Sequence, residues 1–409
     1  MHTFFVLLLI IKNPLYTINK NNIKLLYYLY IIMEDILRYK IFYQNGNGPN
    51  DCRSHKLEKI YDQWSPEGRF YKTNISCGKG SFKNAFLGYD FLDNIKNKRN
   101  ETSFNKYKKI IWIETKYIMN DDYKERYVNE LKLTKKKHKN ILNLISVFLI
   151  NIPEKVIVTI YPYYNTLRNY FKEPTLQSNA PPLEYERKIF KFINEMISGL
   201  EFLHNELNII HRDIKVDNIM IDDENNVKII DFGLSTKSGV PKMKRQESVM
   251  SQDDPKISDV SKLSLLGTPN YMAPEMYDED KNYDNKVDIY AFGLTILSII
   301  FNKEPFNKET ELSLSNGVID IMYYQLSTYL EYIKSKVSSE NNIDIILDRE
   351  YKKFGKDVNV TKNKLKRYPL LKLIIEDCIK PVQIRPNITE LKSKYLGKIE
   401  AILAIKKSS

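Results

Sequence analysis

The segment His211–Asn218 reads HRDIKVDN, and two shorter signatures follow it, Asp231-Phe-Gly233 and Ala273-Pro-Glu275. The segment contains an aspartate, Asp213, that can accept a proton from a reacting hydroxyl. Asn218 and Asp231 carry side-chain oxygens of the kind that Mg²⁺ prefers as ligands. Asp213, Asn218 and Asp231 are therefore side chains of the types that acid–base and metal-binding chemistry uses.

In this order, and with a glycine-rich loop upstream, the signatures resemble those of protein kinases. The resemblance implies an α+β, two-lobed fold, in which an antiparallel sheet with one helix precedes a mainly α-helical lobe. It also implies ATP and Mg²⁺ as cofactors and proteins with Ser or Thr as substrates. Lys215 would steady the transferring phosphate, and together with Gly267-Thr-Pro269 it matches serine/threonine rather than tyrosine kinases. The same resemblance predicts that Glu275 pairs with Arg385 and that Asp288 holds the backbone of the HRDIKVDN segment.

The order of expected elements fits two lobes. Short runs rich in Ile, Phe and Tyr predict strands at 69–76, 85–89, 109–117, 144–150 and 155–160, with a charged helix at 121–137. Apolar residues at helical spacing predict a helix at 184–204, and a nearly all-apolar run predicts a buried helix at 286–301. We expect an N-terminal extension at 1–66, a kinase domain at 67–398 with lobes 67–162 and 163–398, and a tail at 399–409. Polar stretches at 93–107, 238–262 and much of 335–366 are interpreted as surface-loop insertions.

Composition narrows the classes of partner and compartment. The formal net charge is +12, but the lysines are spread along the chain, so we expect no nucleic-acid binding. Three distant cysteines exclude a disulfide framework and a four-cysteine zinc site, which favours a reducing, cytoplasmic location. The apolar runs at 4–11 and 25–32 are shorter than the ~18 residues of a membrane span. We interpret the extension as a disordered leader or a mis-assigned start, with a membrane anchor as the less favoured alternative.

The glycine-rich loop departs from the usual pattern in a way that bears on phosphate binding. It reads GKGSFK from Gly78 to Lys83, so a lysine stands at the third glycine position. The strand that should carry the phosphate-binding lysine has Ile113 at that position, and the next helix offers Glu130 as the usual partner of that lysine. Either Lys83 reaches the phosphates from the loop, or phosphate binding is crippled and the chain is a pseudokinase that acts as a nucleotide-binding scaffold. The loop residues expected to contact nucleotide are Gly78, Gly80, Ser81 and Lys83.

These features resemble the with-no-lysine (WNK) kinases. Further shared features are Gly68-Arg-Phe70 before the loop, Trp112 followed by a non-lysine and Glu114, and Tyr290-Ala-Phe-Gly293. The resemblance implies that Lys83 replaces the strand lysine. Two alternatives stay open, a solvent-facing Lys83 and an STE-like kinase in which Lys116 is the phosphate lysine. The chain has Asp231-Phe-Gly233 where WNK kinases have Asp-Leu-Gly, so chloride inhibition and the downstream pathway are not carried over.

Two further predictions concern adenine binding and regulation. Thr159 is expected at the gatekeeper position, and Ile160 is expected to hold adenine through its carbonyl, because Pro162 has no N–H to donate. Ser264 and Thr268 are the regulatory candidates before the Ala-Pro-Glu signature, where a phosphate on Ser264 could pair with Arg212. Competing phosphorylation candidates are Ser248, Ser251, Ser258 and Ser261.

Overall fold

The structure, a computed structural model, describes residues 65, 69–79, 83–91, 107–116, 121–150, 156–172, 182–238, 267–277, 283–305, 343–354 and 357–405. Its described residues form two compact units, one up to residue 137 together with 142–163, the other comprising 138–141 and the chain from 164 onward. The division after residue 163 falls one residue later than the predicted lobe boundary. Apart from Ser65, the predicted N-terminal extension lies outside the described residues, as do most of the predicted insertions at 93–107 and 238–262.

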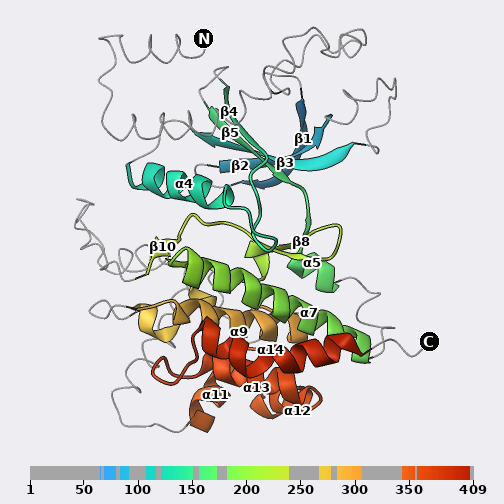
Figure 1. The fold of residues 1–409 in the computed structure, drawn as a ribbon, viewed down its shortest axis with the longest axis vertical. Helices are drawn as coiled ribbons and strands as arrows, with labels where there is room; N and C mark the ends of the chain where they lie inside the picture. Colours follow the sequence, from blue (N-terminus) through green and yellow to red (C-terminus); the bar gives the residue numbers. More distant parts are fainter. Residues whose placement is uncertain are drawn as a thin grey trace, which may run out of the picture. The chain divides into compact units, whose positions relative to one another are not determined.

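The first unit is a five-stranded antiparallel sheet with one helix, as the sequence predicted (Figure 1). Its strands are β1 (Phe70–Lys79), β2 (Lys83–Asp90), β3 (Lys108–Lys116), β4 (Ser146–Ile150) and β5 (Val156–Pro162), in the spatial order β1-β2-β3-β5-β4. The helix is α4 (Asp121–Thr134). Its last turn carries Lys132, a charge that suits the negative end of a helix.

The two faces of this sheet differ in chemistry. On one face Phe70, Trp112, Phe148 and Ile160 form part of a buried apolar cluster, in which the Trp112 and Phe148 rings meet edge to face at 5.2 Å. The β2–β3–β5 ladder runs without a register shift, so alternate residues of each strand share a face. The other face therefore carries Lys83 opposite Thr115. This alternation decides which lysines of the sheet can meet α4.

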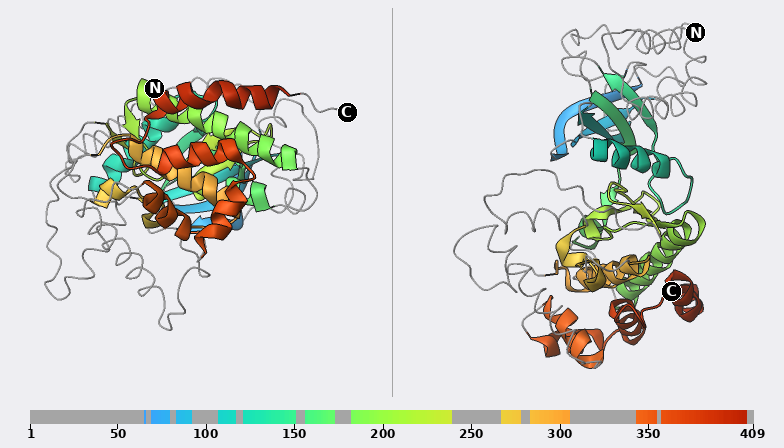
Figure 2. Two further views of the ribbon diagram at one scale, coloured as in Figure 1. Left: turned by 90° about the horizontal axis from the view of Figure 1, so that it is seen from below. Right: turned by 90° about the vertical axis from the view of Figure 1, so that its left-hand side faces the viewer.

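The second unit is mainly helical, which confirms the predicted α+β kinase fold. Its helices are α5 (Leu167–Lys172), α7 (Pro182–Glu201), α9 (Lys286–Phe301), α11 (Ile343–Lys352), α12 (Val358–Leu365), α13 (Pro369–Ile379) and α14 (Ile388–Ala404). Short strands pair as β6 (Asn165–Thr166), β8 (Ile219–Ile221) and β9 (Val227–Ile229), and as β7 (Ile209–Ile210) with β10 (Thr236–Lys237). Helix α13 packs on α9 and α14 packs on α7 (Figure 2). Helix α9 is buried nearly all round and has the predicted bounds.

Two sequence predictions about this unit were wrong. Helices α11 and α12 lie inside 335–366, which had been interpreted as an insertion. Buried Leu347, Tyr351 and Phe354 recur at helical spacing there, but the many Lys and Asn residues between them hide the pattern. The domain also continues past residue 398, because α14 runs to Ala404 with Ile399 buried on its inner face. Among the described helices, none is long and apolar enough to cross a membrane.

Candidate active site

A buried aspartate organises the HRDIKVDN segment in the second unit. Asp288, in the first turn of α9, is fully buried and accepts hydrogen bonds from the backbone amides of His211 and Arg212, both at 2.8 Å. Burial alone would raise the pKa of Asp288, but its bond to His204 and the other groups around it hold the pKa below its usual range. Arg212 adopts a left-handed backbone with φ of 68°, a conformation that the two amide bonds help to maintain. The predicted role of Asp288 is confirmed.

The third partner of Asp288 is His204, which the sequence analysis missed. Its Nε2 lies 2.8 Å from Asp288 Oδ2, and both side chains are fully buried. His204 belongs to a π-helical turn, Phe202–Glu206, that continues α7. The sequence could have indicated its burial, because His204 lies four residues after buried Leu200, on the inner face of the same helix.

The structure brings the predicted catalytic residues of this unit together. Asp213 receives hydrogen bonds from Lys215 Nζ at 2.9 Å, Asn218 Nδ2 at 2.7 Å and Thr268 Oγ1 at 2.6 Å. Lys215 Nζ also donates to Thr268 Oγ1 at 2.5 Å. Burial would raise the pKa of Asp213, but Lys215 and Thr268 outweigh it and the pKa lies below its usual range. Asp213 is thus a carboxylate at neutral pH, the form that can accept a proton.

Thr268, named from the sequence as a regulatory candidate, lies in this catalytic cluster. The half-buried residue bonds Asp213 through both its amide and its hydroxyl. The preceding Gly267 has φ of 148°, and a Cβ there would lie 2.6 Å from the Arg212 carbonyl oxygen. Only glycine fits this turn without strain, so the Gly-Thr pair follows from the close approach of two backbone segments.

The donor set for a metal ion fits Mg²⁺. Asn218 directs its Nδ2 toward two oxygens of Asp213, at 2.8 and 2.7 Å, which leaves its Oδ1 available as a ligand. The Ile230 amide donates to the Asn218 carbonyl at 3.0 Å, and the next residue, Asp231, is exposed. Asp231 adopts φ of 62°, and its carboxylate accepts a 3.3 Å bond from the Gly233 amide. Within the described ranges, no three His, Cys, Asp or Glu side chains gather as a metal cluster.

The predicted pair of Glu275 and Arg385 is also confirmed. Arg385 Nη1 lies 2.5 Å from Glu275 Oε1, and Nη2 lies 3.3 Å from Oε2. Arg385 also donates to the carbonyls of Lys380 and Lys286, and its guanidinium stacks 4.9 Å from the Tyr290 ring centre. This pair ties the Ala-Pro-Glu signature to α9 and to the loop that precedes α14.

In the first unit, the displaced lysine meets the predicted glutamate. Lys83 Nζ, on β2, lies 2.5 Å from Glu130 Oε2, on α4, whose side chain is only 9% exposed. Tyr127, one helical turn earlier, places its ring 5.6 Å from the same ammonium. Ile113, at the usual lysine position, pairs instead with Ala85 and Thr159 in the middle of the sheet.

Lys116 does not share this environment. Lys116 is exposed and lies opposite Val156 in the sheet. It directly follows Thr115, and Thr115 lies opposite Lys83 on β2. Because side chains alternate along a strand, Lys116 points to the opposite face of the sheet. Gly78 lies in the exposed part of β1, one residue before the strand ends at Lys79, and a Cβ there would meet nothing within 4 Å. Gly80 and Ser81 lie outside the described residues.

The adenine contact predicted for Ile160 stays a prediction. Ile160 is an interior residue of β5, and its carbonyl already accepts the Ile145 amide at 2.8 Å. Adenine would have to share that oxygen with the sheet. Thr159 is buried beside Ile113, and Pro162 continues the strand opposite Ile110. Ser264 and the competing loop serines lie outside the described residues.

Comparison with known proteins gives a consistent result. A sequence model of the protein kinase domain matches residues 96–395. The chain is 31% identical over 291 residues, 69% of its length, to serine/threonine-protein kinase Wnk of Drosophila melanogaster, and 31% identical over 278 residues, 63% of its length, to serine/threonine-protein kinase WNK3 of Mus musculus. It is 29% identical over 258 residues, 63% of its length, to serine/threonine-protein kinase CLA4 of Candida albicans. The matched regions span only 10%, 13% and 23% of these three relatives.

Proposed function

Because this chain belongs to the protein kinase domain family, we propose that it is a WNK-like serine/threonine kinase in which Lys83 serves as the phosphate-binding lysine. One observation carries the proposal, the 2.5 Å ion pair of Lys83 with Glu130 beside an isoleucine at the usual lysine position. A lysine held by a buried carboxylate on a rigid helix is oriented for phosphate contact, whereas a solvent-facing loop lysine is not.

The residues of the second unit would carry the transfer. Bound ATP supplies the phosphoryl group, and Mg²⁺ neutralises charge on its phosphate oxygens. Asn218 and Asp231 would hold the ion through their side-chain oxygens. Asp213 would orient the substrate hydroxyl and take its proton, and Lys215 would stabilise charge on the transferring group. The hydroxyl of Thr268, bonded to both Asp213 and Lys215, would hold these two side chains in fixed positions relative to each other.

A second candidate, a nucleotide-binding pseudokinase, is favoured by Ile113 at the position of the usual lysine. The retained Asp213, Asn218 and Asp231 speak against it, as does the lysine–glutamate pair. The STE-like alternative is not supported, because Lys116 lies on the sheet face opposite Lys83 and Glu130.

The test is phosphate transfer from ATP–Mg²⁺ to a serine-rich protein and to the enzyme itself. We expect Lys83→Met to lose as much activity as Asp213→Asn, while Lys116→Met stays close to wild type. A Lys83→Met variant that keeps most of the activity would refute the role of Lys83. Wild type as inert as Asp213→Asn, in a preparation shown to be folded and activated, would favour the pseudokinase.

A further inference from the structure

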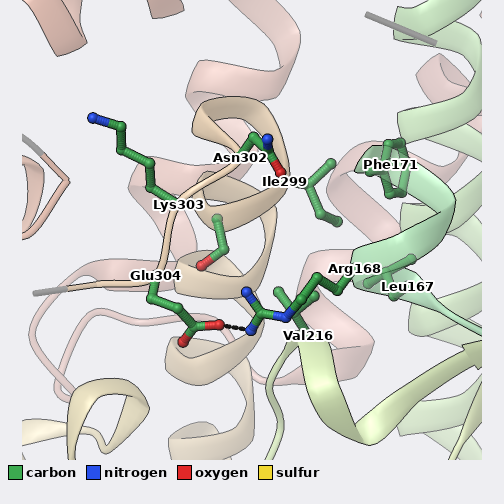
Figure 3. A pocket seen from close by; sticks show the side chains of 9 residues that line it. Leu167, Arg168, Phe171, Val216, Ile299, Asn302, Lys303 and Glu304 are labelled. Atoms are coloured by element: carbon green, nitrogen blue, oxygen red, sulfur yellow. Dashed lines mark ion pairs between the residues drawn. The ribbon is translucent and has the colours of Figure 1, made fainter. Parts of the chain in front are cut away.

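Arg168 in α5 is held between two carboxylates of the second unit. Its Nε and Nη2 donate to Asp217 Oδ1 and Oδ2 at 2.8 and 3.1 Å. Its Nη2 also pairs with Glu304, which follows the end of α9, and Figure 3 shows this ion pair at the edge of a small cavity. The cavity floor is apolar, formed by Leu167, Phe171, Val216 and Ile299. One guanidinium thus neutralises part of a doubly acidic site.

This acidic site adjoins the position of the phosphoacceptor. Asp217 directly precedes Asn218, whose side-chain amide bonds Asp213. Tyr271 approaches from a second segment, since it lies three residues after Thr268 and donates its hydroxyl to Glu304 Oε2 at 3.1 Å. Asn218 and Thr268, which both bond Asp213, therefore lie within three residues of Asp217 and Tyr271, which contact Arg168 and Glu304 respectively. On this arrangement, a peptide that presents its hydroxyl to Asp213 would pass near Asp217 and Glu304.

The charged residues of this site determine whether a substrate side chain next to the acceptor serine or threonine can bind a carboxylate there. Asp217 is 53% exposed and Glu304 is 31% exposed, so two carboxylates would be open to a cationic side chain if Arg168 were absent. Lys303 lines the same cavity with its ammonium directed away from the ion pair (Figure 3). Among the described residues at this site, Arg168 is the cation in direct contact with both carboxylates.

We propose that Arg168 is a specificity-determining residue, because its guanidinium takes the place that an arginine or lysine of a substrate would otherwise fill. The inference rests on the proposed kinase function. The enzyme then accepts proteins without a basic residue selected beside the acceptor serine or threonine. A substrate cation would have to displace Arg168 from a bidentate carboxylate bond, which removes its advantage.

The test compares serine peptides that carry arginine or its uncharged analogue citrulline at each position flanking the serine. The measured quantity is the ratio of kcat/KM for the two peptides, and in parallel the ratio of their Kd values by fluorescence anisotropy. Wild type should show ratios within about threefold at every position. Arg168→Met should prefer arginine about tenfold at one position, the effect of one charge-assisted hydrogen bond, and mainly through KM.

A second variant, Asp217→Asn, removes a negative charge from the site and tests the inference independently. Asp217→Asn removes one of the two carboxylates that Arg168 contacts and leaves a less acidic site, so it should disfavour the arginine peptide about threefold relative to wild type. If Arg168→Met does not fold, as judged by circular dichroism, this arm decides the question. The control is Lys392→Met, which removes a cation from an ion pair with Glu201 elsewhere on the unit and should leave every ratio unchanged.

Two results would overturn the inference. One is a folded Arg168→Met whose ratios equal those of wild type, and the other is wild type that already prefers arginine tenfold beside the serine. Failure of the proposed function looks different, because wild type would then phosphorylate neither peptide of any pair. The anisotropy ratios would still judge the role of Arg168 in that case.

Discussion

Arg385→Met should destabilise the second unit strongly, because it leaves the Glu275 carboxylate without its partner. The Arg385 side chain is fully buried and that of Glu275 is 9% exposed. Removing one member of a buried ion pair costs about 3–5 kcal/mol. The carbonyls of Lys380 and Lys286 also lose their donors, at about 0.5–1.5 kcal/mol each. We expect a loss of about 4–8 kcal/mol, a large share of the ~5–15 kcal/mol that stabilises an ordinary domain.

Urea unfolding followed by far-UV circular dichroism measures this loss, since the second unit is mainly helical. The double variant Arg385→Met/Glu275→Leu removes both charges and should be more stable than Arg385→Met alone by about 2–3 kcal/mol. Lys392→Met, which breaks a half-buried pair with Glu201, should cost less than about 1 kcal/mol. The reasoning is refuted if Arg385→Met costs no more than this control, or if the second substitution brings no recovery.

Three further predictions concern the loop around Asp213. Gly267→Ala should cost about 1–3 kcal/mol in thermal unfolding, because it strains a backbone at φ of 148° and meets the Arg212 carbonyl, whereas Gly397→Ala on open α14 surface should cost nothing. Thr268→Val should lower kcat about tenfold and raise the pKa of Asp213, so the acid limb of the pH–activity profile moves to higher pH, while Thr268→Ser keeps the wild-type profile. Asp288→Asn should be less stable than wild type at neutral pH. Folding lowers the pKa of Asp288, so the ionised carboxylate contributes its full stability above its unfolded pKa of about 3.9 and loses that contribution as the pH falls below this value. A stability difference between wild type and Asp288→Asn that is equal at neutral and acidic pH would contradict this prediction.

Much of the site could be predicted from sequence because its chemistry requires particular side chains at short, regular spacing. Asp213, Lys215 and Asn218 lie in one segment, and the structure joins them by direct hydrogen bonds. The long apolar run at 286–301 likewise predicted where α9 begins and ends. Prediction failed where polar composition masked sparse apolar contacts, as in α11, and where a buried polar residue such as His204 looks like any other helix position.

The sequence alone determined that the chain has the parts of a kinase, because each signature is local and its residue types follow from phosphoryl transfer. It left open whether Lys83 or Lys116 faces Glu130, since that depends on the register of β2 and β3 and on how α4 packs against them. Lys83 and Glu130 are 47 residues apart, and Arg168 and Asp217 are 49 residues apart. Only tertiary packing brings such pairs within hydrogen-bond distance, because neither residue type nor spacing along the chain specifies which distant carboxylate a cation will meet.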